Sequence, residues 1–213
     1  MRGIGMSGTR NLTARPQPIS ALEPFFASNL IGYEGFTPQD EPFILHLGSG
    51  DSTIPVELAV RGNRRQLCVD FSSTAVKLMK ERHAEYGIEW RLMDVRDMKG
   101  IDDASVDVAF DKGTLDAMIH GSPWSPPQEV RHNTSAYLRE DGGRFLHVTF
   151  RQPHFMTPLL NPEGLWTMHR QVFGDNTDSF DYYGYLMRKL PIENTQNPET
   201  GGVTDAQGTY CGK

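Results

Sequence analysis

The sequence predicts an α/β protein built on one doubly wound, mostly parallel sheet that ends in an antiparallel hairpin. Between residues 43 and 150, short apolar runs alternate with stretches of helical periodicity. Such alternation is typical of parallel strands, because a parallel pair needs a crossover and the crossover is usually a helix. After residue 150, two extended runs follow one another without a helical crossover, which indicates a hairpin.

Each element of this fold has its own sequence signal. Apolar runs predict the parallel strands, at residues 43–47, 66–69, 88–93, 106–110 and 143–150. Helical spacing predicts helices at residues 53–61, 73–86 and 127–139, and Gly62 and Gly87 stand where C-terminal caps belong. The hairpin is predicted to use residues 165–173 and 180–190, with a turn at 174–176.

The chain of 213 residues suits one large domain, which we place at residues 19–190. Residues 1–18 contain three arginines, no acid and few apolar side chains, so a flexible N-terminal segment is expected there. Residues 191–213 are polar and rich in turn formers, and they are interpreted as a flexible tail.

The amino-acid composition argues against several classes of binding partner. The 21 Lys and Arg against 27 Asp and Glu give a formal net charge of −6, which argues against a nucleic acid partner. No apolar stretch approaches the ~20 residues of a membrane-spanning helix, so no membrane partner is expected. The two cysteines, Cys68 and Cys211, offer neither a disulfide framework nor metal spacing, which favours a cytoplasmic protein without a bound metal. Nothing in the sequence indicates an oligomeric state.

The first predicted strand runs into a glycine-containing turn, Gly48-Ser49-Gly50, followed by Ser52 as a candidate helix cap. Glycines at this point let the backbone approach a ligand closely. Asp70 ends the next strand, 20 residues after Gly50, where an acid can accept hydrogen bonds from a ribose diol. An ordinary strand-to-helix turn, and a helix-capping role for Asp70, are the structural alternatives.

Asp94 and Asp111 continue the series at the ends of the two following strands. The carboxyl ends of parallel strands meet at one edge of a sheet, and ligands of open α/β sheets bind in the crevice there. The glycine turn and the three acids therefore describe one nucleoside-sized site.

Among nucleoside cofactors, S-adenosylmethionine fits this pattern best. It has a ribose diol and an exocyclic adenine amine for the first two acids, and Asp111 would complement its sulfonium cation. A dinucleotide fits less well, because the third glycine of that fingerprint is Thr53 here. Tyr185 and Lys189 have the spacing of an oxidoreductase pair, but they fall in an extended run rather than on a helix.

Four short runs carry a family resemblance: Leu-His-Leu-Gly-Ser-Gly at 45–50, Val-Asp-Phe-Ser at 69–72, Asp-Val-Arg at 94–96 and Phe-Asp-Lys-Gly-Thr-Leu-Asp-Ala at 110–117. Together they resemble the class I, seven-strand S-adenosylmethionine-dependent methyltransferases, whose fold is Rossmann-like. The Asp-Lys-Gly-Thr-Leu-Asp run is similar to the branch that includes lysine and N-terminal methyltransferases of elongation factor 1A. That branch usually has a Trp/Tyr-rich, Arg-containing motif before the first strand, where this chain has only Tyr33, Glu34 and Phe36.

The resemblance implies a seven-stranded sheet with a reversed terminal strand. It also implies that the glycine turn lies against the methionine part of the cofactor, that Asp70 binds the ribose, and that Asp94 and the Val95 amide bind the adenine. The cofactor-binding set it implies is Gly48, Ser49, Gly50, Asp70, Phe71, Asp94, Val95 and Asp111.

Fewer sequence signals point to the residues that would bind the methyl acceptor. Asp111, placed beside the methyl group by the resemblance, and Asp116, which could orient an amine, are the candidate catalytic residues. His147 alternates within an apolar strand and is interpreted as a core residue rather than a base. Three residues in a proline-rich loop or just after the fifth strand are candidates for substrate binding: Trp124, Arg151 and His154.

We therefore expect an enzyme, an S-adenosylmethionine-dependent methyltransferase directed to nitrogen, with a protein amine or a small metabolite as acceptor. Two alternatives remain open: a non-catalytic, nucleoside-binding interaction module, and an NAD(P)-dependent oxidoreductase.

Overall fold

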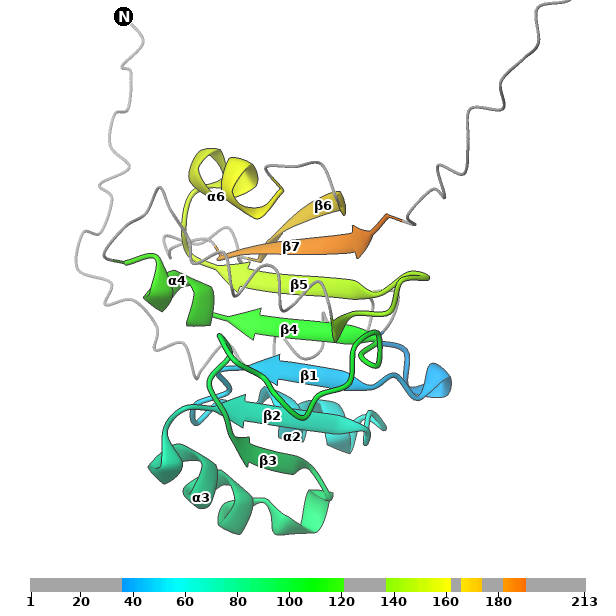
Figure 1. Ribbon diagram of the computed structural model, residues 1–213, viewed down its shortest axis with the longest axis vertical. Coiled ribbons are helices and arrows are strands. Elements are labelled where there is room, and N and C mark those ends of the chain that lie inside the picture. The colour runs from blue at the N-terminus through cyan, green and yellow to red at the C-terminus, as the bar shows by residue number, and fades with distance from the viewer. Residues whose placement is uncertain (1–35, 121–136, 162–165, 174–181, 191–213) are drawn as a thin grey trace, which may run out of the picture.

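The computed structural model describes residues 36–120, 137–161, 166–173 and 182–190, and its strands form one sheet (Figure 1). The strands of this part are β1 (Ile44–Leu47), β2 (Gln66–Asp70), β3 (Glu89–Leu92), β4 (Val108–Lys112), β5 (Arg144–Thr149), β6 (Trp166–Phe173) and β7 (Tyr182–Lys189). Their spatial order is β3-β2-β1-β4-β5-β7-β6. Strands β1 to β5 are parallel, and β7 runs antiparallel between β5 and β6. The predicted fold class, with its C-terminal antiparallel hairpin, is confirmed.

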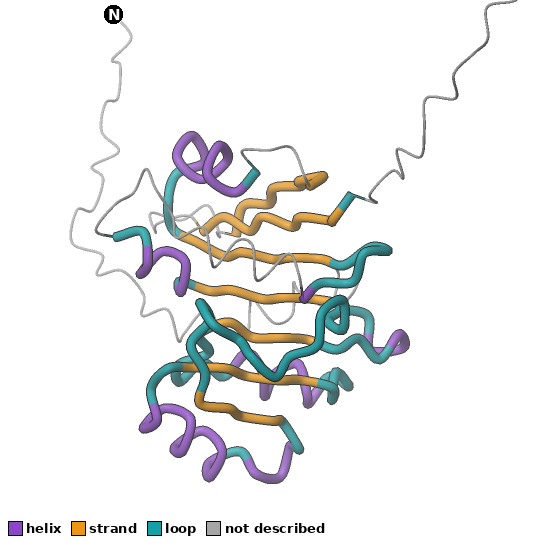
Figure 2. Tube along the Cα trace, viewed as in Figure 1, coloured by secondary structure: helices purple, strands orange, loops and turns teal. Residues whose placement is uncertain are grey.

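Helices and short turns connect these strands (Figure 2). The described elements are η1 (Pro38–Asp40), α2 (Ile54–Val60), α3 (Ser73–Arg82), η2 (Ala84–Tyr86), α4 (Thr114–Met118) and α6 (Pro153–Leu160). The helix predicted over 73–86 is interrupted, because His83 leaves the helical region with φ −124° and the chain continues as η2 to Gly87. Sequence periodicity does not predict α4 or α6, since α4 has only five residues and α6 contains Pro158.

Several sequence predictions lie outside the described residues. These are the flexible N-terminal segment, the first part of the predicted domain at 19–35, nearly all of the helix at 127–139, the hairpin turn at 174–176 and the flexible tail.

The fourth strand lies two residues later than predicted. Val106 does not join the sheet and forms an isolated bridge with Leu138 instead. At the other end, Asp111 and Lys112 remain in the ladder because each pairs with a residue of β5. Asp111 therefore lies inside β4 rather than after it, which corrects the sequence prediction and changes what surrounds its carboxylate.

Apolar side chains alternate between the two faces of the sheet, and each face has its own core. On one face, called here the α2 face, helix α2 packs against β1, β4 and β5 through Ile44, Ile54, Leu58, Val108, Phe110 and Leu146. On the other, called here the α4 face, α4, α6 and the 93–107 connection pack against the sheet through Leu47, Met98, Ala109, Leu115 and Met156. Burial of both faces explains why the inner parallel strands β1, β2, β4 and β5 are rich in apolar residues, whereas β3 at the edge of the sheet has an exposed Glu89 and Leu92.

The carboxyl ends of β1, β2, β4 and β5 meet at one edge of the sheet, at the left in Figure 1, where α4 also lies. This edge brings together the turns that follow each strand and is the place where open α/β sheets bind ligands. In the described part of the chain, no helix has the length and apolar character needed to cross a membrane. The same residues contain no group of three or more side chains suited to hold a metal ion.

Candidate functional site

Backbone hydrogen bonds hold the glycine turn after β1 against the end of β2. Ser49 N donates to Val69 O at 3.0 Å, and Gly50 N donates to Oδ2 of Asp70 at 2.8 Å. Gly48 and Gly50 have φ of +60° and +53°, in the left-handed region that favours glycine. A Cβ added at Gly50 would meet no atom within 4 Å, so the turn presents bare backbone at the edge of the sheet.

Asp70, the last residue of β2, has a nearly buried carboxylate with a defined orientation. Its Oδ2 accepts from Gly50 N and its Oδ1 accepts from Ser72 N, both at 2.8 Å. Each carboxylate oxygen can accept a second hydrogen bond, so a ribose diol can still donate to Asp70. Helix α3 is capped by Ser72, not by Asp70. The next residue, Phe71, is 80% exposed and places a large apolar ring at the same edge.

Asp94, just beyond β3, is paired with Arg96. Arg96 Nε lies 2.9 and 3.1 Å from the two carboxylate oxygens, and Nη2 lies 2.5 Å from Oδ2. These hydrogen bonds, with a further one from the Arg96 backbone, lower the pKa of Asp94 to about 2. An adenine amine would therefore share an ionised carboxylate with a guanidinium. The intervening Val95 has a buried side chain that packs into the core of the α4 face.

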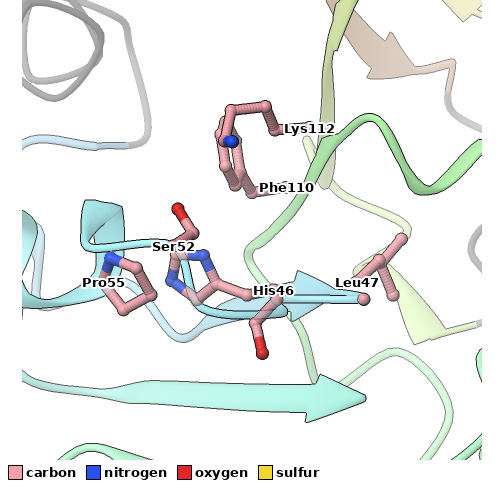
Figure 3. A pocket seen from close by; sticks show the side chains of 8 residues that line it. His46, Leu47, Ser52, Pro55, Phe110 and Lys112 are labelled. Carbon is pink, nitrogen blue, oxygen red and sulfur yellow. The ribbon is translucent and has the colours of Figure 1, made fainter. Parts of the chain in front are cut away.

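A small, open cavity lies beside the glycine turn on the α2 face (Figure 3). In Figure 3, Ser52, Pro55 and His46 approach one another, while Phe110 and Lys112 extend from β4. The full lining is His46, Leu47, Gly48, Ser49, Ser52, Pro55, Phe110 and Lys112. The N-cap of α2 is Thr53, one residue after the predicted cap, and it makes no side-chain capping bond. The Ser52 hydroxyl nevertheless accepts from Ile54 N, the first amide of the helix, at 3.4 Å.

His46 is buried in the wall of this cavity as a neutral imidazole, because burial lowers its pKa to about 4. Gln66 Nε2 donates to the carbonyl oxygens of Pro55 and Asn63, at 2.8 and 2.6 Å. The Gln66 Oε1 must then be the acceptor that faces His46 Nε2 at 2.7 Å, which assigns the proton to Nε2. His46 Nδ1 is thus left as a hydrogen-bond acceptor.

On the opposite, α4 face, Asp111 is buried and its carboxylate is used inside the fold. Oδ1 accepts from Thr114 N at 2.8 Å, and Oδ2 accepts from Leu115 N at 3.0 Å, so the carboxylate holds the first turn of α4. Oδ2 also lies 3.2 Å from Nδ1 of the fully buried His147. Strand pairing with β5 carries Asp111 into the core, so its carboxylate lies inside the fold and not beyond the end of the strand, where its sequence pattern predicts it.

Asp116, on α4, forms the second buried acid of this face. Its Oδ1 accepts from Thr149 Oγ1 at 2.8 Å and from Arg151 Nε at 3.0 Å. Its Oδ2 is buried and has no hydrogen-bond partner among the described residues. Burial raises the pKa of Asp116, and the charge on Asp111 adds to this, while His147, Thr149 and Arg151 act in the opposite direction.

The structure separates the three residues predicted to bind substrate. Arg151 contacts Asp116 and so lies with the candidate catalytic residues. His154 is exposed on α6, with its ring 5.2 Å from that of Phe155. Trp124 lies outside the described residues. Sequence patterns did not single out Arg96, Thr149 or Gln66, although the Asp-x-Arg spacing at Asp94 was a local signal for the first of them.

Comparison with known proteins agrees with this geometry. Residues 44–142 match the family described as "Methyltransferase domain". The chain is 34% identical to "EEF1A lysine methyltransferase 4" of Bos taurus over 156 residues, which is 68% of this chain and 60% of that protein. The chain therefore spans about 60% of the length of this curated relative.

Solved structures share the fold at low sequence identity. The N-methyltransferase NodS from Bradyrhizobium japonicum WM9 superposes with a TM-score of 0.60 at 14% identity, covering 80% of this chain and 97% of that one. A geranyl diphosphate methyltransferase in complex with SAM superposes with a TM-score of 0.58 at 15% identity, covering 79% and 86%.

Proposed function

Because this chain belongs to the class I, seven-strand methyltransferases, we propose that it uses S-adenosylmethionine to methylate an amine nitrogen of a protein substrate. The observation that carries the proposal is the hydrogen bond between Gly50 N and Asp70 at the carboxyl edge of the sheet. This hydrogen bond joins the exposed backbone of the glycine turn to an oriented carboxylate. A nucleoside cofactor needs both, because its ribose diol donates to a carboxylate while the rest of the ligand lies close to the protein backbone.

The residues at this edge fit the cofactor chemically. Asp70 offers acceptor capacity to a diol, Asp94 offers an ionised acceptor to an adenine amine, and Phe71 offers an exposed apolar ring. Ser49 adds a buried hydroxyl with no partner among the described residues, next to the cavity where the methionine part is expected. We assign binding of the cofactor to these residues together with Gly48, Gly50 and Val95. When bound, S-adenosylmethionine supplies a methyl group activated by a sulfonium.

The protein's own contribution to the reaction is to hold an acceptor nitrogen in line with that methyl group. Asp116 is our candidate for orienting the amine, because its Oδ2 is an acceptor that the described fold leaves unpartnered. Arg151 and Thr149 hold the other oxygen and so fix the direction of the carboxylate. Asp111 is assigned a positioning role, since both of its oxygens anchor the first turn of α4.

A protein acceptor is favoured by the curated relative, whose name gives a lysine of elongation factor 1A as its substrate. We extend that substrate class to this chain, with a small metabolite as the competing acceptor. A net charge of −6 supports a protein or metabolite over a nucleic acid. We also propose a cytoplasmic location, in keeping with the scarcity of cysteine and the free, buried thiol of Cys68.

The oxidoreductase alternative lacks support in the structure. The oxidoreductase pair would need Tyr185 and Lys189 on a helix facing a cofactor. Both instead lie on β7, with Tyr185 fully buried and Lys189 Nζ 3.4 Å from the carbonyl oxygen of Leu138.

The test uses methyl-labelled S-adenosylmethionine, the full chain and purified elongation factor 1A. Asp70→Asn keeps the side-chain volume but removes the carboxylate, and Asp103→Asn, an exposed acid in the connection between β3 and β4, is the matched control. The proposal expects labelled elongation factor with the wild-type protein and with the Asp103 variant, and at least tenfold less label with Asp70→Asn.

Two other outcomes have distinct meanings. If label appears only in small molecules when a cell extract replaces the elongation factor, the protein acceptor is wrong and the transferase activity stands. If the wild-type protein transfers no label and does not bind S-adenosylhomocysteine in calorimetry, the proposed function is overturned.

A further inference from the structure

Thr114 lies in the Asp-Lys-Gly-Thr-Leu-Asp run, and the proposed function does not use its side chain. Its hydroxyl lies 2.8 Å from the carbonyl oxygen of Leu47 and 3.1 Å from that of Gly48, and donates to this pair. Leu47 is the last residue of β1 and Gly48 is the first residue of the glycine turn. A residue 66 positions away in sequence therefore holds the point where the strand becomes the cofactor turn.

The contact between Thr114 and the turn leaves no room for a side chain at Gly48. A Cβ on Gly48 would lie 2.1 Å from Thr114 Oγ1 and 2.7 Å from its methyl carbon. These separations are far below van der Waals contact, so the hydroxyl reaches the carbonyls only because residue 48 is glycine. The two motifs, Gly-Ser-Gly and Asp-Lys-Gly-Thr, are therefore complementary parts of one contact.

Thr114 also begins α4, and α4 is fastened to two further strands. Its backbone N–H donates to Asp111 of β4 at 2.8 Å. Two residues later, Asp116 accepts from Thr149 at the end of β5. A helix of five residues is thus attached to β1 through Thr114, to β4 through Asp111 and to β5 through Asp116. The cofactor turn and the candidate acceptor side share this one short element.

We propose that Thr114 is a positioning residue that couples the glycine turn to α4, so that a ligand held by the turn also orders the acceptor side of the site. The inference rests on the proposed function, because it takes the glycine turn to be the cofactor-binding element. Coupling of this kind is reciprocal. The factor by which an ordered α4 raises the cofactor affinity equals the factor by which bound cofactor shifts the equilibrium of α4 toward its ordered state. Thr114 acts through the backbone of Leu47 and Gly48 and needs no contact with either substrate.

The experiment compares three variants with the wild-type chain, using S-adenosylhomocysteine as the probe. Thr114→Val keeps the shape of the side chain but removes the hydroxyl, and Thr114→Ser keeps the hydroxyl but removes the methyl group. Thr167→Val makes the same substitution on the exposed face of β6, at the far edge of the sheet. Calorimetry measures affinity, hydrogen exchange follows the amides of 114–118 with and without the probe, and thermal unfolding shows that each variant is folded.

We expect Thr114→Val to bind the probe about three- to tenfold more weakly, the effect of losing the hydrogen bond from one hydroxyl. The probe should slow exchange at 114–118 in the wild-type, Thr114→Ser and Thr167→Val proteins but not in Thr114→Val. A merely structural role would lower the unfolding temperature without removing this ligand-dependent protection.

Equal affinity and equal protection in Thr114→Val and the wild-type protein would overturn the coupling while leaving the proposed function standing. If Thr114→Val does not fold, the same comparison with Thr114→Ala decides the question, with Thr114→Ser as the hydroxyl-bearing reference. No binding of the probe by the wild-type protein would overturn both the coupling and the function on which it rests.

Discussion

His46 donates from Nε2 to the side-chain oxygen of Gln66 at 2.7 Å, on a strand whose other side chains are buried and apolar. Gln66 is in turn fixed by its two donations to backbone carbonyls, so the neutral form of His46 is built into the floor of the cavity. Burial in this position is what disfavours protonation of the imidazole. Protonation of His46, which lies next to the cofactor turn, therefore destabilises the folded protein.

This relationship predicts a loss of stability at acid pH. The pKa of His46 is about 4 in the folded protein and 6.5 in the unfolded chain, so between these values the unfolded chain binds more protons. The free energy of unfolding therefore falls as the pH drops from 6.5 to 4, by up to about 3 kcal/mol from this one group. The amide of His46→Gln can still donate to Gln66 but does not titrate. Denaturant titrations of this variant at several pH values should show a decrease in the free energy of unfolding that is smaller by this amount.

The control for His46→Gln is His169→Gln, which removes an exposed imidazole from β6. Its stability profile should follow that of the wild-type protein across the same pH range. An acid sensitivity in His46→Gln equal to that of the wild type would show that His46 is not buried in its neutral form.

The steric contact between Gly48 and Thr114 predicts a strong non-additivity. Gly48→Ala should lower the free energy of unfolding by about 2–4 kcal/mol, part from the positive φ and part from the collision with Thr114. In a Thr114→Ala background only the backbone strain and a tight Cβ contact remain, so the same substitution should cost about 1–2 kcal/mol. Chemical denaturation of the four proteins of this cycle measures the difference.

Gly50→Ala provides the matched control, because Gly50 has a similar φ of +53° but open space around its missing Cβ. Its cost should be that of the backbone strain alone, about 1–2 kcal/mol, and should not depend on residue 114. Additive effects of Gly48→Ala and Thr114→Ala would contradict the close contact.

Local patterns predicted the placement of the glycine turn and Asp70 at one edge of the sheet far better than the contacts of Asp116, and the reason is physical. Asp70 is recognisable because an apolar run ends in a single acid at a fixed distance from the glycine turn, all within two adjacent elements. The partners of Asp116 lie 33 and 35 residues further along the chain, at the end of β5 and just after it. Periodicity reports which face of an element is buried, but it does not report which side chains meet across elements.

The misplacement of Asp111 has the same origin. Its run of apolar neighbours ends at Phe110, so the sequence places a charged residue outside the strand. Pairing with β5 extends β4 through Lys112, and the buried carboxylate is then satisfied by two backbone N–H groups of α4. These amides belong to a helix too short for periodicity to reveal.

The exposed ion pair between Asp94 and Arg96 predicts that a substitution of Asp94 weakens cofactor binding but hardly changes the stability of the fold. Asp94→Ala should weaken S-adenosylhomocysteine binding about tenfold, by removing an acceptor for the adenine amine. The free energy of unfolding should change by less than about 1 kcal/mol, because the ion pair is largely exposed and such pairs contribute little. The neighbouring pair Asp97 and Lys99 has the same spacing, so Asp97→Ala is the control and should leave affinity unchanged. Equal affinity of the Asp94 variant would remove Asp94 from the cofactor site.

Asp116 predicts a pH dependence opposite in sign to that of His46. Its pKa is raised by burial above the 3.8 of the unfolded chain, so just above pH 3.8 the folded protein binds more protons. Ionisation of this carboxylate therefore lowers the free energy of unfolding as the pH rises. Asp116→Asn does not ionise, so its stability relative to the wild type should increase from pH 4 upward, while Asp103→Asn controls for the loss of one charge. A difference that stays constant with pH would mean that Arg151 and His147 fully compensate the buried charge, and the unpartnered oxygen would then give no reason to assign the acceptor amine to Asp116.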